Sequence, residues 1–398
     1  MNLRIKVNYY EVKKFFLIIY LSILKHYALI RINLEMVKIE EYYFLCNQRI
    51  LIPKNKFKKS ESPKISIISP IYNQEKNLHR YLMSIQNQEF SDLEIILIDD
   101  LSNDNTLKVI EELKEFDERI IFIKNNKRKG TLVSRNIGVL KSKADYLIFI
   151  DPDDIISQNI LHHCFLLAKR FNYDLIRYNI YMGNYKMNLP DVVNNLKSKP
   201  IFKPNIFLYL FYGFGKLLQL DYYITNKLIK RTLFIRAMNS INKYYLDQFM
   251  IDCEDGLMNY MLYKLSDSLY FTTKIGYYYI KTNRSITFNS DNFINRLKSN
   301  FLYFRFIFES TKNNNIEKKI ANYIFFQISN RNKNSIIKLI KLQTSDYRFY
   351  SNIISLYLQD IFISLKSKLI LKKMKKAIIK IKNIKLNNSR INIQIIFV

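Results

Sequence analysis

Five acidic residues directly follow two apolar segments of the sequence, where they could perform charge-dependent chemistry. They are Asp99, Asp100, Asp151, Asp153 and Asp154. One acidic cluster would be unremarkable, because aspartate often caps the helix that follows a strand. Two such clusters around one crevice would repel each other unless a cation or hydrogen-bond donors lay among them. Carboxylate oxygens suit Mg²⁺ and Mn²⁺, and phosphates commonly complete their coordination. We therefore predict a divalent cation, Mn²⁺ or Mg²⁺, at these acids.

The elements that would position these acids alternate between short apolar strands and amphipathic helices. The predicted strands cover 65–69, 93–98, 120–123 and 146–150. The predicted helices cover 77–87, 104–116 and 131–140. This alternation is typical of an α/β fold with right-handed crossovers and a mostly parallel central sheet. Ligands of such sheets bind at the carboxyl ends of the strands, which is where the acids stand.

The composition excludes several classes of protein. Hydrophobic residues make up 48% and charged residues 24% of the 398-residue chain, which excludes a mostly disordered chain, a collagen and a coiled-coil rod. The net charge of +29 is of the size found in proteins that bind nucleic acid or anionic lipid. The abundant residue types have A/T-rich codons, however, so genome composition could supply much of the lysine excess. Acids at the strand ends would repel a phosphate backbone, and we predict no nucleic-acid partner.

The seven glycines form neither G-x-G-x-x-G nor a P-loop, so a nucleotide would have to bind without a glycine-rich phosphate cradle.

Four motifs, in this order, resemble those of the family 2 glycosyltransferases, which have the GT-A nucleotide-diphospho-sugar transferase fold. They are P-I-Y-N at 70–73, I-D-D-x-S-x-D-x-T at 98–106, G-T-L-V-S-R-N-I-G at 130–138 and D-P-D-D at 151–154. The resemblance covers roughly Lys64 to Thr287. It implies transfer of a sugar from a nucleoside-diphosphate sugar, in the first place a UDP-sugar, to a hydroxyl group of a glycan, a protein or a lipid-linked acceptor.

The resemblance implies roles for individual positions of this sequence. Tyr72 would stack on the base, and Asp100 would accept a hydrogen bond from it. Arg135 would lie near the nucleotide, where its guanidinium could bind phosphate through two parallel hydrogen bonds. Asp151 and Asp153 would reach the ribose and the metal. The implied nucleotide-sugar-binding residues are Pro70, Tyr72, Asn73, Asp99, Asp100, Gly130, Arg135 and Asp151, and the implied metal ligands are Asp153 and Asp151. Plain packing for Tyr72 and an exposed helix charge for Arg135 are the alternatives.

A second acidic motif, D-C-E-D-G at 252–256, resembles the E-D pair that supplies the catalytic base in inverting members of this family. The resemblance implies that Asp255 is the base and that Glu254 orients the acceptor or the base, although the two roles could be exchanged. Glycine often precedes this pair, whereas Cys253 does so here. The alternative is an acidic pair that interacts with the macrodipole at a helix N-terminus.

The chain divides into three predicted regions: an N-terminal segment and linker at 1–63, the GT-A domain at 64–290, and a basic, helical extension at 291–398. The apolar segment 15–24 predicts a packed helix or a signal anchor. The lysine-rich segment 366–390 predicts an amphipathic helix that either binds an anionic membrane surface or exposes its lysines to solvent. We expect a membrane-associated protein, held peripherally or by a signal anchor, and otherwise a cytoplasmic one.

Two functions of different classes follow from these residues. The first is an inverting, metal-dependent glycosyltransferase. The alternative is a catalytically inactive relative that binds a nucleotide-sugar or a glycan at a membrane surface. The first is favoured because the acids implied for catalysis and metal binding are all present.

Overall fold

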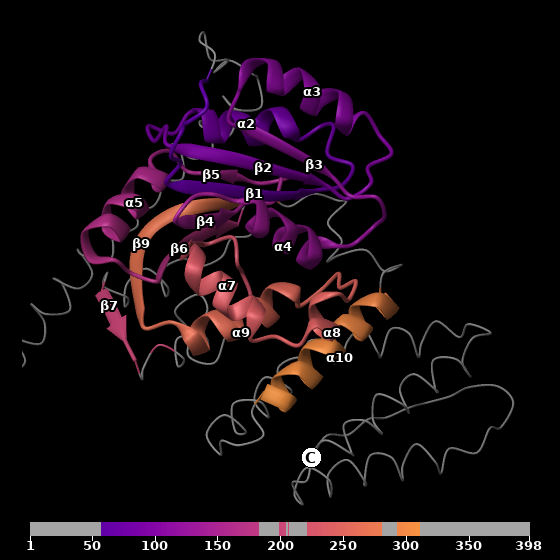
Figure 1. Cartoon of the computed structure of the whole chain (residues 1–398), viewed down its shortest axis with the longest axis vertical. Helices are drawn as coiled ribbons and strands as arrows, with labels where there is room; N and C mark the ends of the chain where they lie inside the picture. The colour runs from indigo at the N-terminus through magenta and orange to yellow at the C-terminus, as the bar shows by residue number, and fades with distance from the viewer. Residues whose placement is uncertain (1–56, 183–198, 204–205, 207–220, 281–292, 311–398) are drawn as a thin grey trace, which may run out of the picture. The chain divides into compact units, whose positions relative to one another are not determined.

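The computed structural model of the protein describes residues 57–182, 199–203, 206, 221–280 and 293–310 (Figure 1). The chain forms two compact units, residues 1–299 and residues 300–398, and the division falls inside helix α10 (Phe293–Ser310). The segments 15–24 and 366–390 lie outside the described residues, so the predictions made for them remain predictions. Among the helices that the structure describes, none combines the length and apolar character needed to cross a bilayer.

Nine strands of the described residues form one mixed sheet in the first unit. They are β1 (Ile65–Ile71), β2 (Leu93–Asp99), β3 (Ile120–Lys124), β4 (Tyr146–Phe149), β5 (Ile155–Ile156), β6 (Leu175–Met182), β7 (Lys199–Phe202), β8 (Lys227–Lys230) and β9 (Ser268–Tyr279). The order is β3-β2-β1-β4-β8-β6-β9-β5, and β7 pairs with β9. Pairing is parallel from β3 to β4 and between β6 and β9, and antiparallel elsewhere.

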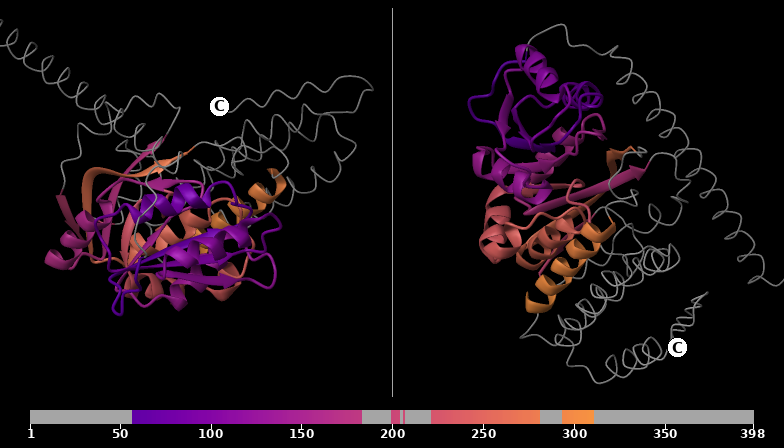
Figure 2. Two further views of the ribbon diagram at one scale, coloured as in Figure 1. Left: turned by 90° about the horizontal axis from the view of Figure 1, so that it is seen from above. Right: turned by 90° about the vertical axis from the view of Figure 1, so that its right-hand side faces the viewer.

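Helices cover both faces of the parallel half of this sheet (Figures 1 and 2). The described helices of this part of the chain are α2 (Leu78–Gln86), α3 (Thr106–Phe116), α4 (Thr131–Lys141), α5 (Ile160–Phe171), α7 (Arg231–Asn239), α8 (Lys243–Leu246) and α9 (Glu254–Leu265). Residues of α2, α3 and α5 pack into one hydrophobic cluster with alternate residues of β1, β2 and β4. Helix α4 packs on the other face of β1 and β2, and it also contacts α7 and α9.

Gly138 lets α4 approach the sheet closely. A Cβ atom at this position would lie 2.5 Å from Cγ2 of Ile68 and 2.9 Å from Cδ1 of Ile98. Both distances are too short for packed carbon atoms, so only glycine fits without a shift of the helix. The close approach holds α4, the helix that carries Arg135, against β1 and β2.

The four strands and three helices predicted between residues 65 and 150 are all present, within two residues at each end. The parallel pairing predicted for them is confirmed. The second half of the sheet is more antiparallel than the first, because β8 inserts between β4 and β6 and runs opposite to both. The sheet as a whole is therefore mixed, and its parallel part is the part that carries the predicted site.

Candidate active site at the carboxyl ends of the strands

The carboxylate of Asp100, at the end of β2, is saturated by hydrogen bonds from the segment that leads into α4. Its Oδ1 accepts from Nδ2 of Asn125 at 2.9 Å and from the backbone N–H of Lys129 at 2.7 Å. Its Oδ2 accepts from the backbone N–H of Gly130 at 2.9 Å and faces Nε of Arg128 at 3.3 Å. Asp100 thus shapes the 125–130 loop, and two of these four donors belong to buried residues, Asn125 and Gly130.

Gly130 begins α4 with φ +85°, which is the left-handed region that favours glycine. A Cβ atom here would also lie 3.1 Å from the ring of Phe249. The backbone geometry alone requires glycine at this position. The proximity of Gly130 to a nucleotide therefore stays a prediction.

Asp99 and Asn73 join the two loops that follow β1 and β2. Both carboxylate oxygens of Asp99 accept from the backbone N–H of Ser102 at 3.2 Å. The backbone N–H of Asn73 donates to Oγ of Ser102, and its side-chain oxygen accepts from the backbone N–H of Asn103, both at 2.9 Å. Asn73 adopts φ +54°, which asparagine tolerates better than most residues. Both side chains are therefore engaged within the loops, and Pro70 is a residue of β1 itself.

The guanidinium of Arg128 packs on the ring of Tyr72, the predicted base-stacking residue. The guanidinium carbon of Arg128 lies 3.4 Å from the Tyr72 ring centroid and 5.9 Å from that of Phe249. Arg128 therefore contacts both Tyr72 and Asp100, the two residues that the sequence assigns to the base. Its own role was not predicted, because Lys127, Arg128 and Lys129 look alike in sequence as a basic run.

The three acids after β4 have different environments. Asp154 is buried and accepts hydrogen bonds from the Tyr277 hydroxyl at 2.6 Å and from the Ile280 backbone at 2.7 Å. It ties this turn to β9, and burial raises its pKa well above the ordinary value. The backbone carbonyl of Asp153 accepts from Arg80 at 2.7 Å, whereas its carboxylate has no ion-pair partner among the described residues.

Arg135 joins the acids after β4 to the second acidic motif. The guanidinium donates to Oδ1 of Asp151 at 2.9 Å and to Oδ1 of Asp255. Its side chain is only 5% exposed. Burial alone would lower the pKa of Arg135, but the charges of Asp255 and Asp151 hold it above its ordinary value. This contact brings Asp151 and Asp255 together, while the roles of both acids and the phosphate role of Arg135 stay predictions.

The start of α9 holds Glu254 and Asp255 in a strained turn. Cys253, the N-cap residue, has φ +63°, a conformation that costs a residue other than glycine about 1–2 kcal/mol. This explains why glycine would suit the position, and it shows that the turn forms with cysteine as well. The second carboxylate oxygen of Asp255 accepts from the backbone N–H of Ile224 at 3.2 Å.

A buried ionic cluster supports the segment that supplies Ile224. Asp221 lies within 2.9 Å of Arg177 and 3.0 Å of Lys227, and it accepts from the hydroxyl of Tyr263 on α9 at 2.6 Å. The two cations hold the pKa of Asp221 below its usual value although burial acts in the opposite direction. Because Tyr263 belongs to α9, the cluster fixes segment 221–224 against the helix that presents Asp255.

Burial and neighbouring charges raise the pKa values of three acids of the site, and the relative weight of these causes differs from one acid to the next. Burial, together with the charge of Asp151, raises the pKa of Asp153 to about 6. Burial and the neighbouring charge of Asp255 raise the pKa of Glu254 to about 8. Burial also raises the pKa of Asp255, but Arg135 opposes that rise. Asp255 is therefore the member of the pair that its surroundings favour in the ionised form.

The donor set at the end of β4 fits a hard divalent cation. Asp151 and Asp153 supply carboxylate oxygens, the side chain of Asp151 is 35% exposed, and a cation would offset the burial and the Asp151 charge that raise the pKa of Asp153. Within the described residues, no group of three or more His, Cys, Asp or Glu side chains is arranged around one point in the way a metal ion requires. The two aspartates are thus the protein ligands available here.

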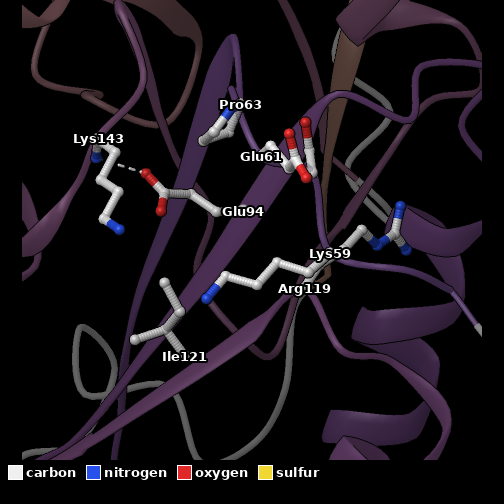
Figure 3. A pocket seen from close by; sticks show the side chains of 8 residues that line it. Lys59, Glu61, Pro63, Glu94, Arg119, Ile121 and Lys143 are labelled. Carbon is white, nitrogen blue, oxygen red and sulfur yellow. Dashed lines mark hydrogen bonds between the residues drawn. The ribbon is translucent and has the colours of Figure 1, made fainter.

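A pocket of about 300 Å³ lies at the opposite, amino-terminal ends of β1, β2 and β3 (Figure 3). Its lining residues are Lys59, Ser60, Glu61, Pro63, Glu94, Arg119, Ile121 and Lys143. The buried carboxylate of Glu94 accepts from Oγ of Ser66 and from the backbone N–H of Lys143, both at 2.6 Å. This pocket contains none of the predicted site residues, and its buried acid is bound by donors of the chain itself.

The match to a known family coincides with the region that carries these strand ends. Residues 66–237 match the profile of Glycosyl transferase family 2. The chain carries a glycosyl transferase family 2 domain. Asp252 to Asp255 lie beyond the matched residues, so the connection of this motif to the domain rests on the contact between Asp255 and Arg135.

Two curated relatives show the extent of the similarity. The domain is 40% identical over 93 residues to the GalNAc(5)-diNAcBac-PP-undecaprenol beta-1,3-glucosyltransferase of Campylobacter jejuni, covering 23% of this chain and 30% of the relative. It is 40% identical over 118 residues to the poly(ribitol-phosphate) beta-N-acetylglucosaminyltransferase TarP of Staphylococcus aureus, covering 28% of this chain and 35% of the relative. The chain therefore spans only about a third of the length of these relatives.

The fold is shared with a solved structure. The structure of S. aureus TarS 1-349 in complex with UDP-GlcNAc superposes with a TM-score of 0.51 at 18% sequence identity, covering 68% of this chain and 72% of that chain. At this identity the likeness shows the fold alone, and the predicted GT-A fold is confirmed.

Proposed function

We propose that the protein is an inverting glycosyltransferase that moves a sugar from a nucleoside-diphosphate sugar, in the first place a UDP-sugar, to a hydroxyl acceptor with the help of a divalent cation. The observation that carries the proposal is the contact of Arg135 with both Asp151 and Asp255. One guanidinium thereby joins Asp151, the acid implied in donor binding, to Asp255, the acid implied as the general base.

The donor would bind across the carboxyl ends of β1, β2 and β4. Tyr72 offers a ring for the base, and the Asp100 carboxylate offers acceptors for a base N–H. Asp153 and Asp151 would hold a divalent cation, Mn²⁺ or Mg²⁺. When bound, such a cation neutralises charge that builds up on a diphosphate leaving group.

Asp255 would act as the general base. Its carboxylate takes the proton of the acceptor hydroxyl while that oxygen attacks the anomeric carbon and the bond from this carbon to the diphosphate oxygen breaks. One such displacement inverts the anomeric configuration, in agreement with the printed names of both relatives, which are β-transferases. Arg135 and the Ile224 backbone hold the base in position and favour its ionised form. General-base help of this kind contributes roughly 10²- to 10⁴-fold.

Glu254, with its pKa of about 8, would be protonated at neutral pH and so be able to donate a hydrogen bond to the acceptor or to Asp255. When the surroundings of two neighbouring acids give them different pKa values, the acid with the higher pKa can donate a proton and the other can accept one. Glu254 and Asp255 would divide their roles in this way.

The acceptor would be a hydroxyl of a glycan, including one carried on a lipid diphosphate. The Campylobacter relative is named for a substrate of the latter kind and the Staphylococcus relative for a poly(ribitol-phosphate). Association with an anionic membrane surface would suit a lipid-linked acceptor, and it remains a prediction for residues outside the described part of the chain.

The proposal is tested by incubating the full chain with a panel of UDP- and GDP-sugars, with Mn²⁺ or with a chelator, and measuring nucleotide release. We expect cation-dependent release from at least one UDP-sugar, and its loss in the Asp255→Asn variant. If the wild-type protein neither binds nor turns over any of these donors, the proposed function is wrong.

A further inference from the structure

The Arg128 side chain lies where a nucleobase would have to bind. Its guanidinium carbon is 3.4 Å from the centroid of the Tyr72 ring, which is the distance of a stacked contact, and Phe249 is the next aromatic ring, at 5.9 Å. Its Nε lies 3.3 Å from Oδ2 of Asp100. Arg128 therefore contacts both Tyr72 and Asp100, the two residues that the proposed function assigns to binding of the nucleobase.

We propose that Arg128 closes the nucleobase site of the donor-free protein and must leave it before the base can stack on Tyr72. The inference rests on the proposed function, because it takes Tyr72 and Asp100 as the residues that receive the base. It adds a residue that controls the strength of donor binding.

The chemistry of the two competing groups is similar. A guanidinium is planar, stacks on aromatic faces and carries N–H donors in its plane. A uracil ring is also planar and carries one N–H in its plane. Stacking on Tyr72 and donation to the Asp100 carboxylate are therefore interactions that either group can make, but the space on one ring face holds only one of them.

The contacts of Arg128 are weak enough to be exchanged. Its side chain is 38% exposed, so both its contact with the Tyr72 ring and its ion pair with Asp100 compete with water. Asp100 keeps three other donors, from Asn125, Lys129 and Gly130, when Arg128 leaves. Displacement of Arg128 therefore opens the site without releasing the loop, and a base N–H can take the vacated position on Oδ2.

The loop offers a matched control. Lys127 carries the same charge, is exposed and directly precedes Arg128. Lys127→Ala and Arg128→Ala remove the same formal charge from the loop, and only the second removes the group that covers Tyr72. Arg128→Lys keeps the charge but lacks the planar face.

The test measures binding of uridine and of UDP to the wild-type protein and the three variants, by ligand-observed NMR, with thermal unfolding to verify that each variant is folded. Uridine has no phosphates, so its affinity reports the base site without the attraction between the loop charge and a diphosphate. We expect Arg128→Ala to bind uridine roughly 3- to 10-fold more tightly than the wild-type protein, because both contacts no longer compete. We expect an intermediate gain for Arg128→Lys and no change for Lys127→Ala.

If Arg128→Ala binds uridine with unchanged or reduced affinity while the wild-type protein binds UDP, Arg128 does not close the site, and the proposed function is unaffected. The same gain in both alanine variants would also overturn the inference, since it would be an effect of charge. If the wild-type protein binds neither UDP nor any nucleotide-sugar, the proposed function fails and the inference fails with it.

Discussion

Two groups of acids differ in their surroundings: one group lies at the end of β2, and the other follows β4 and begins α9. Among the β2 acids, the Asp100 carboxylate accepts from four donors, and both oxygens of Asp99 accept from the backbone N–H of Ser102. Among the β4–α9 acids, Asp151, Asp153, Glu254 and Asp255, the Arg135 guanidinium contacts Asp151 and Asp255, and Asp255 also accepts from the Ile224 backbone.

The difference separates acids that hold the fold from acids available for chemistry. A carboxylate such as that of Asp100, which already accepts from four donors, can bind a ligand N–H only in exchange for one of them, and removing it leaves buried donors without acceptors. A carboxylate with few donors is costly to keep charged, and the raised pKa values of Asp153, Glu254 and Asp255 express that cost. Such a group gains most from a cation or a proton.

Removal of the general base, Asp255, should have the strongest effect on activity. We expect Asp255→Asn to lower kcat by roughly 10²- to 10⁴-fold, because proton removal from the acceptor is lost. The affinity for the donor should stay within a few-fold, since the group acts in the chemical step. Steady-state kinetics and donor titration measure the two effects separately, and wild-type turnover would move the role to Glu254 or elsewhere.

The second prediction concerns the acid without an ion-pair partner. We expect Asp153→Asn to lower kcat/KM by at least about 10²-fold, because a metal-assisted displacement loses a ligand of the cation. Tyr277→Phe offers a control, since it removes a hydroxyl that contacts Asp154 and the backbone N–H of Asp151 but removes no carboxylate. Full activity of Asp153→Asn in a chelator would contradict a metal role for Asp153.

The β2 acids and the β4–α9 acids should also differ in their contribution to stability. We expect Asp100→Ala to lower the free energy of unfolding by roughly 2–4 kcal/mol, because buried donors of the 125–130 loop lose their acceptor. Asp153→Ala should change it by less than about 1 kcal/mol, since the backbone donor to its carboxylate is its own N–H and no loop depends on it. Denaturant unfolding of both variants without ligands measures the difference, and equal losses would refute the distinction between the two groups.

The smallest expected effect is on the pH dependence of stability. The pKa of Glu254 is raised from 4.5 to about 8 in the folded protein, so the folded state binds more protons than the unfolded state between these values. The free energy of unfolding contributed by Glu254 therefore falls as the pH rises through this window. We expect Glu254→Gln to flatten that fall, measured by denaturant unfolding at about pH 5 and about pH 8. A slope identical to the wild type would show that Glu254 titrates normally.

The sequence predicted the parallel half of the fold because its strands are continuous apolar runs and its helices show clear spacing. The other half could not be predicted in this way: β8 is only four residues long, with lysine at both ends, and β9 mixes Thr, Lys and Tyr and contains irregular pairing. These strands are defined by the neighbours they pair with, which a local pattern does not contain.

The site was predicted to a similar extent. Residue types at strand ends located the acids, and resemblance supplied their roles, but neither indicated which acids are saturated. That property depends on the backbone of Lys129 and Gly130, on the path of the Arg135 side chain, and on the placement of Arg128 over Tyr72. All of these are set by tertiary packing.

The most direct measurement of the central claim is the binding of Mn²⁺ with and without UDP, followed by the electron paramagnetic resonance of the free ion, for the wild-type protein, Asp153→Asn and Asp100→Asn. If Asp151 and Asp153 hold a cation together with a diphosphate, UDP should strengthen Mn²⁺ binding to the wild-type protein by at least about 10-fold. Asp153→Asn should abolish this enhancement, whereas folded Asp100→Asn should retain a Mn²⁺ site. Undiminished enhancement in Asp153→Asn would contradict the account.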